Sequence, residues 1–298
     1  MKIAIDRMNL LRPLGHVSSV VERRNTIPIL ANIVLRAESS KLSLTATDMD
    51  MDIMTELDCS VIQEGSCTVP AHLLNDIIRK LPDGSEVSIH VSDGNAQISA
   101  GRSSFKVPTL PVDDFPAFNT SDLPVKFILT TADLRHQIDM TRFAISTEET
   151  RYYLNGIYFH KSDSGALAAV ATDGHRLALA RIDMPQGAET MPEIILPRKA
   201  VGELRKLLDD AEGEMHVSLS ETRAEFAFGS VRLTSKLIDG SFPDYTRVIP
   251  EGNDKILTVD RSLFSSAVDR VSTISSEKSR SVKLAVSGTT LTLSASNP

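Results

Sequence analysis

The 298 residues carry a formal net charge of −7, and 41% of them are hydrophobic although none is tryptophan. This length allows two or three domains, whose cores must be built from aliphatic side chains. Cys59 and Cys67 match no zinc or disulfide pattern, which excludes a disulfide-rich secreted class and indicates a cytoplasmic protein. The charged N-terminus is not a signal peptide, and no stretch is long enough to span a membrane.

The predicted elements follow one order, and that order recurs along the chain. Amphipathic spacing predicts a first helix over 7–24, two strands, a helix over 70–81 with Pro70 in its first turn, and a strand over 86–91. The second set has helices over 132–144 and 197–210, with Pro197 at the start of the latter, and a strand over 214–220. A fifth helix is expected over 261–280. Two helices and several antiparallel strands in each set predict an α+β fold of repeated domains.

The residues themselves also repeat, at an offset of 124 to 127 positions. "LSLTATDMD" (42–50) aligns with "LAAVATDGH" (167–175), and "TLPVDDFPAF" (109–118) aligns with "KLIDGSFPDY" (236–245). "VKLAVSGTTLTLSASN" (282–297) begins a third copy. We therefore predict domains at 1–123, 124–250 and 251–298, and we expect the third to be truncated, because its strands lack partners to close a core.

Basic residues concentrate in the five predicted helices. These helices hold 16 lysines and arginines against 9 acidic residues, so they carry +7 while the rest of the chain carries −14. If the helices share one surface, that surface would attract the phosphates of a nucleic acid without reading its sequence. The alternative, that lysine and arginine simply decorate solvated helices, remains equally open.

Catalytic alternatives find little support in the motifs. Asp173 and His175 could form an acid–base pair, but the Asp-Gly sequence between them is more typical of a tight turn. "DMDMD" (48–52) would place three carboxylates on one face of a strand, yet the second copy does not retain them, so a metal site is disfavoured. The common phosphate-binding and nucleophile motifs are absent. No cofactor and no metal are expected.

Several longer motifs resemble one known family. They are "RYYLNG" (151–156), "ATDGHRLA" (171–178), "TSKLIDGSFPDYTRVIP" (234–250) and "SSEK" (275–278). The chain resembles the bacterial DNA polymerase III β subunit family, the sliding clamps, from its first residue to its last. The resemblance implies a non-catalytic processivity factor that encircles duplex DNA, with helices lining the hole and sheets at the rim. It also implies that polymerase III α subunit, other polymerases and the clamp loader δ subunit bind it, and that it works in the cytoplasm at the nucleoid.

The resemblance further implies particular site residues. A pocket for partner peptides with Leu and Phe anchors would be formed by Arg151, Leu154, Thr172, Gly174, His175, Arg176, Leu177, Pro243, Arg247 and Val248. DNA-facing candidates are Arg23, Arg24, Arg79, Lys80, Arg198, Lys199, Arg205 and Lys206. A head-to-tail homodimer would use Arg102, Phe105, Lys106 and Ile274. Because the third copy is short, we expect the 298-residue chain to fail to close that ring.

Overall fold

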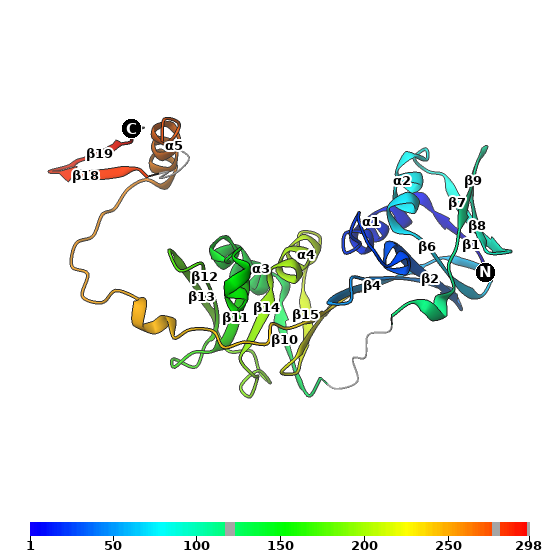
Figure 1. The fold of residues 1–298 in the computed structure, drawn as a ribbon, viewed down its shortest axis with the longest axis horizontal. Coiled ribbons are helices and arrows are strands. Elements are labelled where there is room, and N and C mark those ends of the chain that lie inside the picture. The colour runs from blue at the N-terminus through cyan, green and yellow to red at the C-terminus, as the bar shows by residue number, and fades with distance from the viewer. Residues whose placement is uncertain (117–122, 276–280, 297–298) are drawn as a thin grey trace. The chain divides into compact units, whose positions relative to one another are not determined.

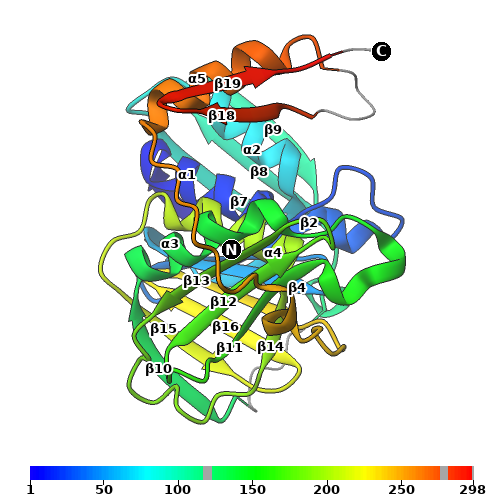
Figure 2. The same ribbon diagram turned by 90° about the vertical axis from the view of Figure 1, so that its left-hand side faces the viewer.

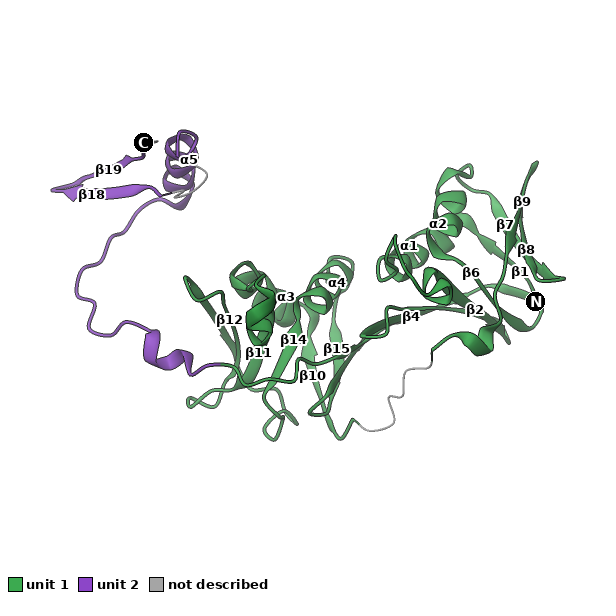
Figure 3. Ribbon diagram, viewed as in Figure 1, with its two compact units in different colours: residues 1–242 green, residues 243–298 purple. Residues whose placement is uncertain are grey.

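The computed structural model describes residues 1–116, 123–275 and 281–296. The chain divides into two compact units, Met1–Phe242 and Pro243–Pro298 (Figure 3). Unit 1 is the larger and contains two copies of one arrangement. The first predicted domain, 1–123, lies within it, whereas residues 243–250 of the second predicted domain belong to unit 2.

The first copy begins the chain and has eleven regular elements besides its short 3₁₀ turns. They are β1 (Lys2–Asp6), α1 (Arg7–Ser18), β2 (Asn32–Glu38), β3 (Lys41–Thr47), β4 (Met51–Asp58), β5 (Ser60–Gln63), β6 (Gly65–Pro70), α2 (Ala71–Lys80), β7 (Glu86–Ser92), β8 (Asn95–Ala100) and β9 (Ser103–Pro108).

The second copy repeats this order without a counterpart of β5. Its elements are β10 (Val125–Thr130), α3 (Thr131–Thr141), β11 (Gly156–Lys161), β12 (Leu167–Thr172), β13 (Leu177–Ile182), β14 (Ile194–Pro197), α4 (Arg198–Leu208), β15 (Glu214–Leu219), β16 (Arg223–Phe228) and β17 (Val231–Lys236). The α+β fold of repeated domains is therefore confirmed.

The two copies share an antiparallel sheet. Its order is β10-β15-β16-β17-β4-β3-β2-β6, so each copy supplies four strands and the join lies between β17 and β4. The remaining strands form the sheets β5-β1-β7-β8-β9 and β13-β12-β11-β14. The helices α1 to α4 lie on one side of the sheets (Figure 1), and Figure 2 shows β10, β15 and β16 side by side. A continuous backbone ladder thus joins the copies, in the register Leu233↔Ile53 and Thr234↔Asp52.

Helix boundaries differ slightly from those that the sequence predicts. Asp6 caps α1 by accepting hydrogen bonds from the backbone of Met8 and Asn9, as N-cap residues do. The helix ends at Ser18, earlier than the predicted residue 24, because the next residue, Ser19, bonds back to the His16 carbonyl and closes the last turn.

Two prolines mark helix starts one residue outside the helix. Pro70 and Pro197 are the N-cap residues of α2 and α4, which begin at Ala71 and Arg198. Proline therefore marks the start of each of these helices, but it lies at the N-cap, one residue before the position that the sequence predicted.

Aliphatic side chains build the core, as the composition predicts. The largest fully buried side chains are all leucine or isoleucine, among them Ile3, Leu10, Leu44 and Ile98. Each such side chain stabilises the fold by about 1.5–3 kcal/mol through burial.

Unit 2 contains a 3₁₀ turn (Tyr245–Val248), α5 (Arg261–Ser272), β18 (Lys283–Ser287) and β19 (Thr290–Ser294). None of the residues of α5 is buried, and Leu263 is 74% exposed. Helix α5 covers less than the predicted 261–280, of which 276–280 lie outside the described residues. Within the described residues of both units, no helix has the length and apolar character needed to cross a membrane.

Candidate functional site

A tight turn, Thr172–Arg176, connects β12 to β13 and is closed by its own polar side chains. The Thr172 hydroxyl donates to the Arg176 carbonyl at 2.8 Å and accepts from the Gly174 amide at 3.1 Å. The Asp173 carboxylate accepts from the amides of His175 and Arg176 at 2.9 and 3.0 Å. These bonds hold the exposed residues Gly174, His175 and Arg176 in one conformation.

Glycine is required at the third position of this turn for two reasons. Gly174 has φ +87°, a conformation that side chains disfavour. A Cβ atom there would also lie 2.5 Å from Nη1 of Arg151. Arg151 therefore lies directly against the turn, where its Nη2 donates to the Asp173 carbonyl at 3.0 Å.

Glu148 fixes the Arg151 guanidinium in this place. It accepts two hydrogen bonds from Arg151, at 2.8 and 2.5 Å. The hydrogen bond from Arg151 lowers the pKa of Glu148, so the pair stays charged at neutral pH. Glu148 was missed by the sequence analysis, although its three-residue spacing from Arg151 was a usable signal.

Apolar side chains lie beside the turn and in the 3₁₀ segment Glu149–Leu154, which carries Arg151. Leu154 is buried at 4% exposure, and Leu177 at the start of β13 is half-buried. The Arg176 guanidinium lies 5.7 Å from the ring centre of Phe143, which is itself 55% exposed. The surface thus offers apolar contact beside fixed cations, and Phe143 is a second residue that the sequence analysis missed.

The other three predicted pocket residues belong to unit 2. Arg247 pairs with Asp244 at 2.7 Å within a 3₁₀ turn, and Val248 is 67% exposed. Pro243 is the first residue of that unit. These three residues lie in unit 2, whereas the Thr172–Arg176 turn lies in unit 1. A pocket that combines them stays a prediction.

Asp173 stabilises the turn, because its carboxylate accepts hydrogen bonds from two backbone amides and pairs with Arg176. Burial raises its pKa, but the amides of His175 and Arg176 and the ion pair with Arg176 (2.9 Å) outweigh burial and lower it. The only contact recorded between Asp173 and His175 within the described residues involves the His175 backbone amide. An acid–base pair needs the ring of His175, and this geometry does not engage it.

The carboxylates of "DMDMD" do not share one face. Asp48 and Asp50 lie in the turn between β3 and β4, whereas Asp52 lies on β4. Asp50 pairs with Lys236 at 3.0 Å. No metal-binding group of three or more acidic, histidine or cysteine side chains occurs within the described residues. A shared face would require residues 48–52 to form one strand, and they do not, because Met49, with φ +79°, turns the chain there.

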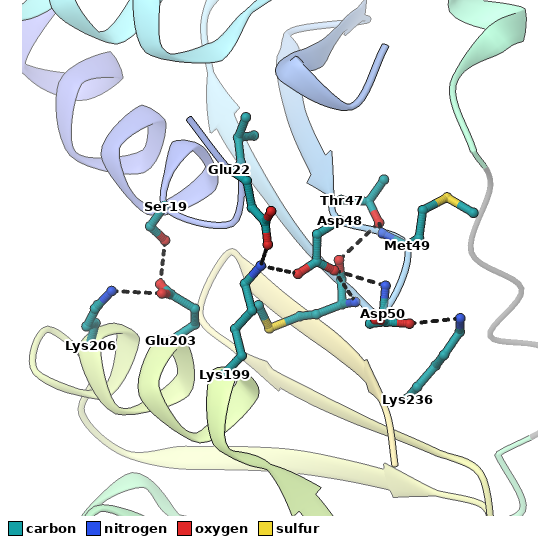
Figure 4. A network of polar contacts seen from close by, with 12 residues as sticks. Ser19, Glu22, Thr47, Asp48, Met49, Asp50, Lys199, Glu203, Lys206 and Lys236 are labelled. Carbon is teal, nitrogen blue, oxygen red and sulfur yellow. Dashed lines mark hydrogen bonds and ion pairs between the residues drawn. The ribbon is translucent and has the colours of Figure 1, made fainter. Parts of the chain in front are cut away.

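The turn at Thr47–Met51 helps to hold the two copies together (Figure 4). Lys199 on α4 reaches Asp48 at 2.6 Å and Glu22 at 2.9 Å. Burial lowers the pKa of Lys199, but its hydrogen bonds to Asp48 and Glu22 outweigh this and raise it. A further bond joins the Ser19 hydroxyl to Glu203 at 2.6 Å. Lys199 therefore contributes to the junction between the copies.

The predicted DNA-facing residues fall into two groups. Four form ion pairs within the chain: Arg79 with Asp76, Lys199 as above, Arg205 with Asp139 and Asp209, and Lys206 with Glu203. The other four have no ion pair within the described residues and are exposed: Arg23, Arg24, Lys80 and Arg198. The second group is the better placed to meet an external anion.

The predicted dimer residues of the first copy lie at an open sheet edge. β9 is the last strand of its sheet, and Phe105 on it is 38% exposed. Lys106 is exposed on the same strand, and Arg102 is exposed in the turn before it. Ile274, in unit 2, is 59% exposed.

Comparison with known proteins identifies the family. Three models of the DNA polymerase III beta subunit match the chain: the N-terminal domain over residues 1–119, the central domain over 128–244 and the C-terminal domain over 246–298. The beta sliding clamp of Caulobacter vibrioides is 54% identical over all of this chain and 81% of its own length. The Escherichia coli beta sliding clamp is 38% identical, with the same coverage.

Solved structures of sliding clamps have the same fold as this chain. A sliding clamp from Bartonella birtlesii, bound to griselimycin, superimposes with a TM-score of 0.95 at 50% identity, covering 98% of this chain and 80% of that one. A clamp from Caulobacter crescentus with polyethylene glycol at a putative beta-motif tethering region gives 0.94 at 54% identity, covering 98% and 79%.

The chain belongs to the DNA polymerase III beta subunit family, the bacterial sliding clamps. It therefore functions as a DNA sliding clamp, a non-catalytic processivity factor for DNA polymerase III. The alternative of an enzyme that uses Asp173 and His175 has no support from the family. The predicted boundaries at residues 123 and 250 are not tested by these matches and stay a prediction.

Proposed function

We propose that the surface around the Thr172–Arg176 turn binds a short peptide segment of partner proteins, with DNA polymerase III α subunit and the clamp loader δ subunit among them. The observation that carries the proposal is a turn locked by its own hydrogen bonds, with Leu177 half-buried and Gly174 exposed beside it. Such a rigid surface loses little conformational entropy on binding. Pro243, Arg247 and Val248 would complete the pocket.

A fluorescence titration tests this assignment. A labelled peptide with Leu and Phe anchors should bind the chain, and Leu177→Asp should weaken binding at least tenfold, since each apolar anchor contributes about 1.5–3 kcal/mol. Ile128→Asp is the matched control, because Ile128 is also an exposed apolar strand residue (44%) but lies on β10. Equal affinity of all three proteins would refute the assignment.

We further propose that the clamp encircles DNA as a head-to-tail homodimer and works at the nucleoid in the cytoplasm. The open edge of β9, with Phe105 exposed on it, supports pairing with a strand of a second chain, and Ile274 offers an apolar contact. Phe105→Asp should shift the dimer toward monomer in sedimentation velocity. An unchanged dimer would show that this edge is not the interface.

The helix side of unit 1 would then face the DNA. Arg23, Arg24, Lys80 and Arg198 support this, because their charge is not neutralised by an ion pair within the described residues. Reversing Arg24 and Arg198 to Glu should reduce retention on DNA, more at low salt than at high salt. Lys199→Glu and Arg205→Glu are less informative, since both side chains already hold structural ion pairs.

A further inference from the structure

A pocket of about 360 Å³ lies where the two copies join. Its lining residues Thr45, Asp52 and Thr234 alternate along β3, β4 and β17 with the core residues Leu44, Ile53 and Leu233. The pocket therefore opens on the face of the shared sheet that points away from the core. Val112, Phe115 and Pro116, which follow β9, form a wall of it. We call it the junction pocket.

Two buried polar atoms in the junction pocket have no hydrogen-bond partner within the described residues. They are Oδ1 of Asp52, whose residue is 8% exposed, and Oγ1 of Thr234, whose residue is fully buried. The two residues are direct cross-strand neighbours in the β4–β17 ladder. Since buried polar groups are almost always hydrogen-bonded in native proteins, an adjacent acceptor and hydroxyl of this kind favour a polar ligand.

The charges around the junction pocket nearly cancel. Arg36 and Arg232 line it together with Asp52. Glu225 lies 3.8 Å from Arg232 and is 13% exposed. Arg223 and Asp48 also act on Asp52 and add one charge of each sign, so the surroundings favour neither a cation nor an anion as the ligand. A neutral group that both donates and accepts hydrogen bonds fits this environment better.

The internal repeat relates the junction pocket to the proposed peptide site. In the alignment of the two copies, Thr47 corresponds to Thr172 and the pair Phe115-Pro116 corresponds to Phe242-Pro243. Asp52, however, corresponds to Leu177. The first copy thus keeps the residues that shape such a site and replaces its apolar anchor position by a carboxyl group.

We propose that the junction pocket binds an extended peptide segment that presents a carboxamide side chain, glutamine or asparagine, to Asp52 and Thr234. The carboxamide NH₂ donates to the Asp52 carboxylate, and its carbonyl accepts from the Thr234 hydroxyl. Val34, Met54 and Phe115 supply apolar contacts for the flanking residues of the segment. The site is distinct from the proposed peptide site, with which it shares no residue.

Three small probes test the proposal by NMR titration of the 298-residue chain: acetyl-Val-Gln-Val-amide, its glutamate analogue and its norleucine analogue. The glutamine probe should bind about fivefold more tightly than either analogue, the range expected for one or two net hydrogen bonds. The methyl signals of Val34 and Met54 should shift on binding. No binding, or equal affinity of the three probes, would overturn the proposal.

Variants separate the junction pocket from the rest of the protein. Asp52→Leu, which installs the residue of the second copy, should abolish the preference for glutamine, whereas Leu177→Asp should leave it unchanged. If Asp52→Leu does not fold, Thr234→Val should lower the preference while Asp52→Asn, which keeps an acceptor, should retain it. A preference that survives both Asp52→Leu and Thr234→Val, or one lost in Leu177→Asp, would contradict the assignment.

Discussion

The turns Thr47–Met51 and Thr172–Arg176 occupy equivalent places in the two copies and are closed by the same hydrogen bonds. In each, the threonine hydroxyl accepts from the amide two residues later, at 3.0 and 3.1 Å, and donates to the carbonyl four residues later, at 3.0 and 2.8 Å. In each, the aspartate accepts from two amides. The same Thr-Asp pair thus closes the turn in both copies.

The two turns differ in the partner that the second carboxylate oxygen of the aspartate binds. Asp48 uses it to hold Lys199 of the other copy, with its side chain 8% exposed. Asp173 uses it to hold Arg176 of the same turn, whose side chain is 57% exposed. One backbone motif therefore serves the junction in the first copy and presents an exposed surface in the second.

The largest expected effect on stability concerns Asp52, the strand residue after the first turn, whose counterpart after the second turn is Leu177. Burial, with a smaller contribution from Glu225, raises the pKa of Asp52 to about 7, against opposition from Arg232 and Arg223; Asp48 adds a small increase. The folded state then binds more protons than the unfolded state between about pH 4 and pH 7, so stability falls as pH rises through this window.

Asp52→Asn removes this titration and should flatten the fall. The fall amounts to at most roughly 4 kcal/mol, about three pKa units at 1.36 kcal/mol each. Chemical unfolding at pH 4.5 and pH 8, with Asp50→Asn as the exposed control, measures it. The same pH dependence in Asp52→Asn and the parent chain would contradict this account of Asp52.

The next effect compares the two aspartates directly. Asp48→Ala should destabilise unit 1 by about 3 kcal/mol, because it leaves two turn amides without their acceptor and removes the more buried of the two carboxylates that bind Lys199. Asp173→Ala should cost only about 1 kcal/mol, since its ion pair is exposed. Urea unfolding of the two variants provides the measurement. Equal losses would show that Lys199 adds nothing at the junction.

The smallest effect concerns the residue with positive φ in each turn. Gly174→Ala should destabilise by about 1–2 kcal/mol, because φ is +87° and the new Cβ would displace Arg151. Met49→Gly should be neutral or slightly stabilising, since Met49 already has φ +79°. Thermal unfolding compares them; a destabilised Met49→Gly beside an unaffected Gly174→Ala would reverse the interpretation.

The repeat, the helices and the aliphatic core could be predicted because periodicity and internal alignment report on local structure and burial. The Thr172–Arg176 turn was also predictable, since Asp-Gly supplies both the capping carboxylate and the residue for positive φ. The contacts that join the two copies could not be predicted. In the sequence, Lys199 is not distinguished from the other basic residues of the predicted helices. It lies close to Asp48 only because β17 pairs with β4 in the folded chain. The same long-range pairing places Asp52 beside Thr234, which no local pattern indicates.

We propose that the second turn presents a partner-binding surface, whereas the first holds the two copies together. The most direct test is a titration of a labelled peptide with Leu and Phe anchors against the double variant His175→Asp, Arg176→Met, which carries the residues of the first turn. We predict at least a tenfold loss of affinity with unchanged thermal stability, and no change in affinity for Asp50→His in the first turn. Unchanged affinity of the double variant, or a loss caused by Asp50→His, would contradict the account.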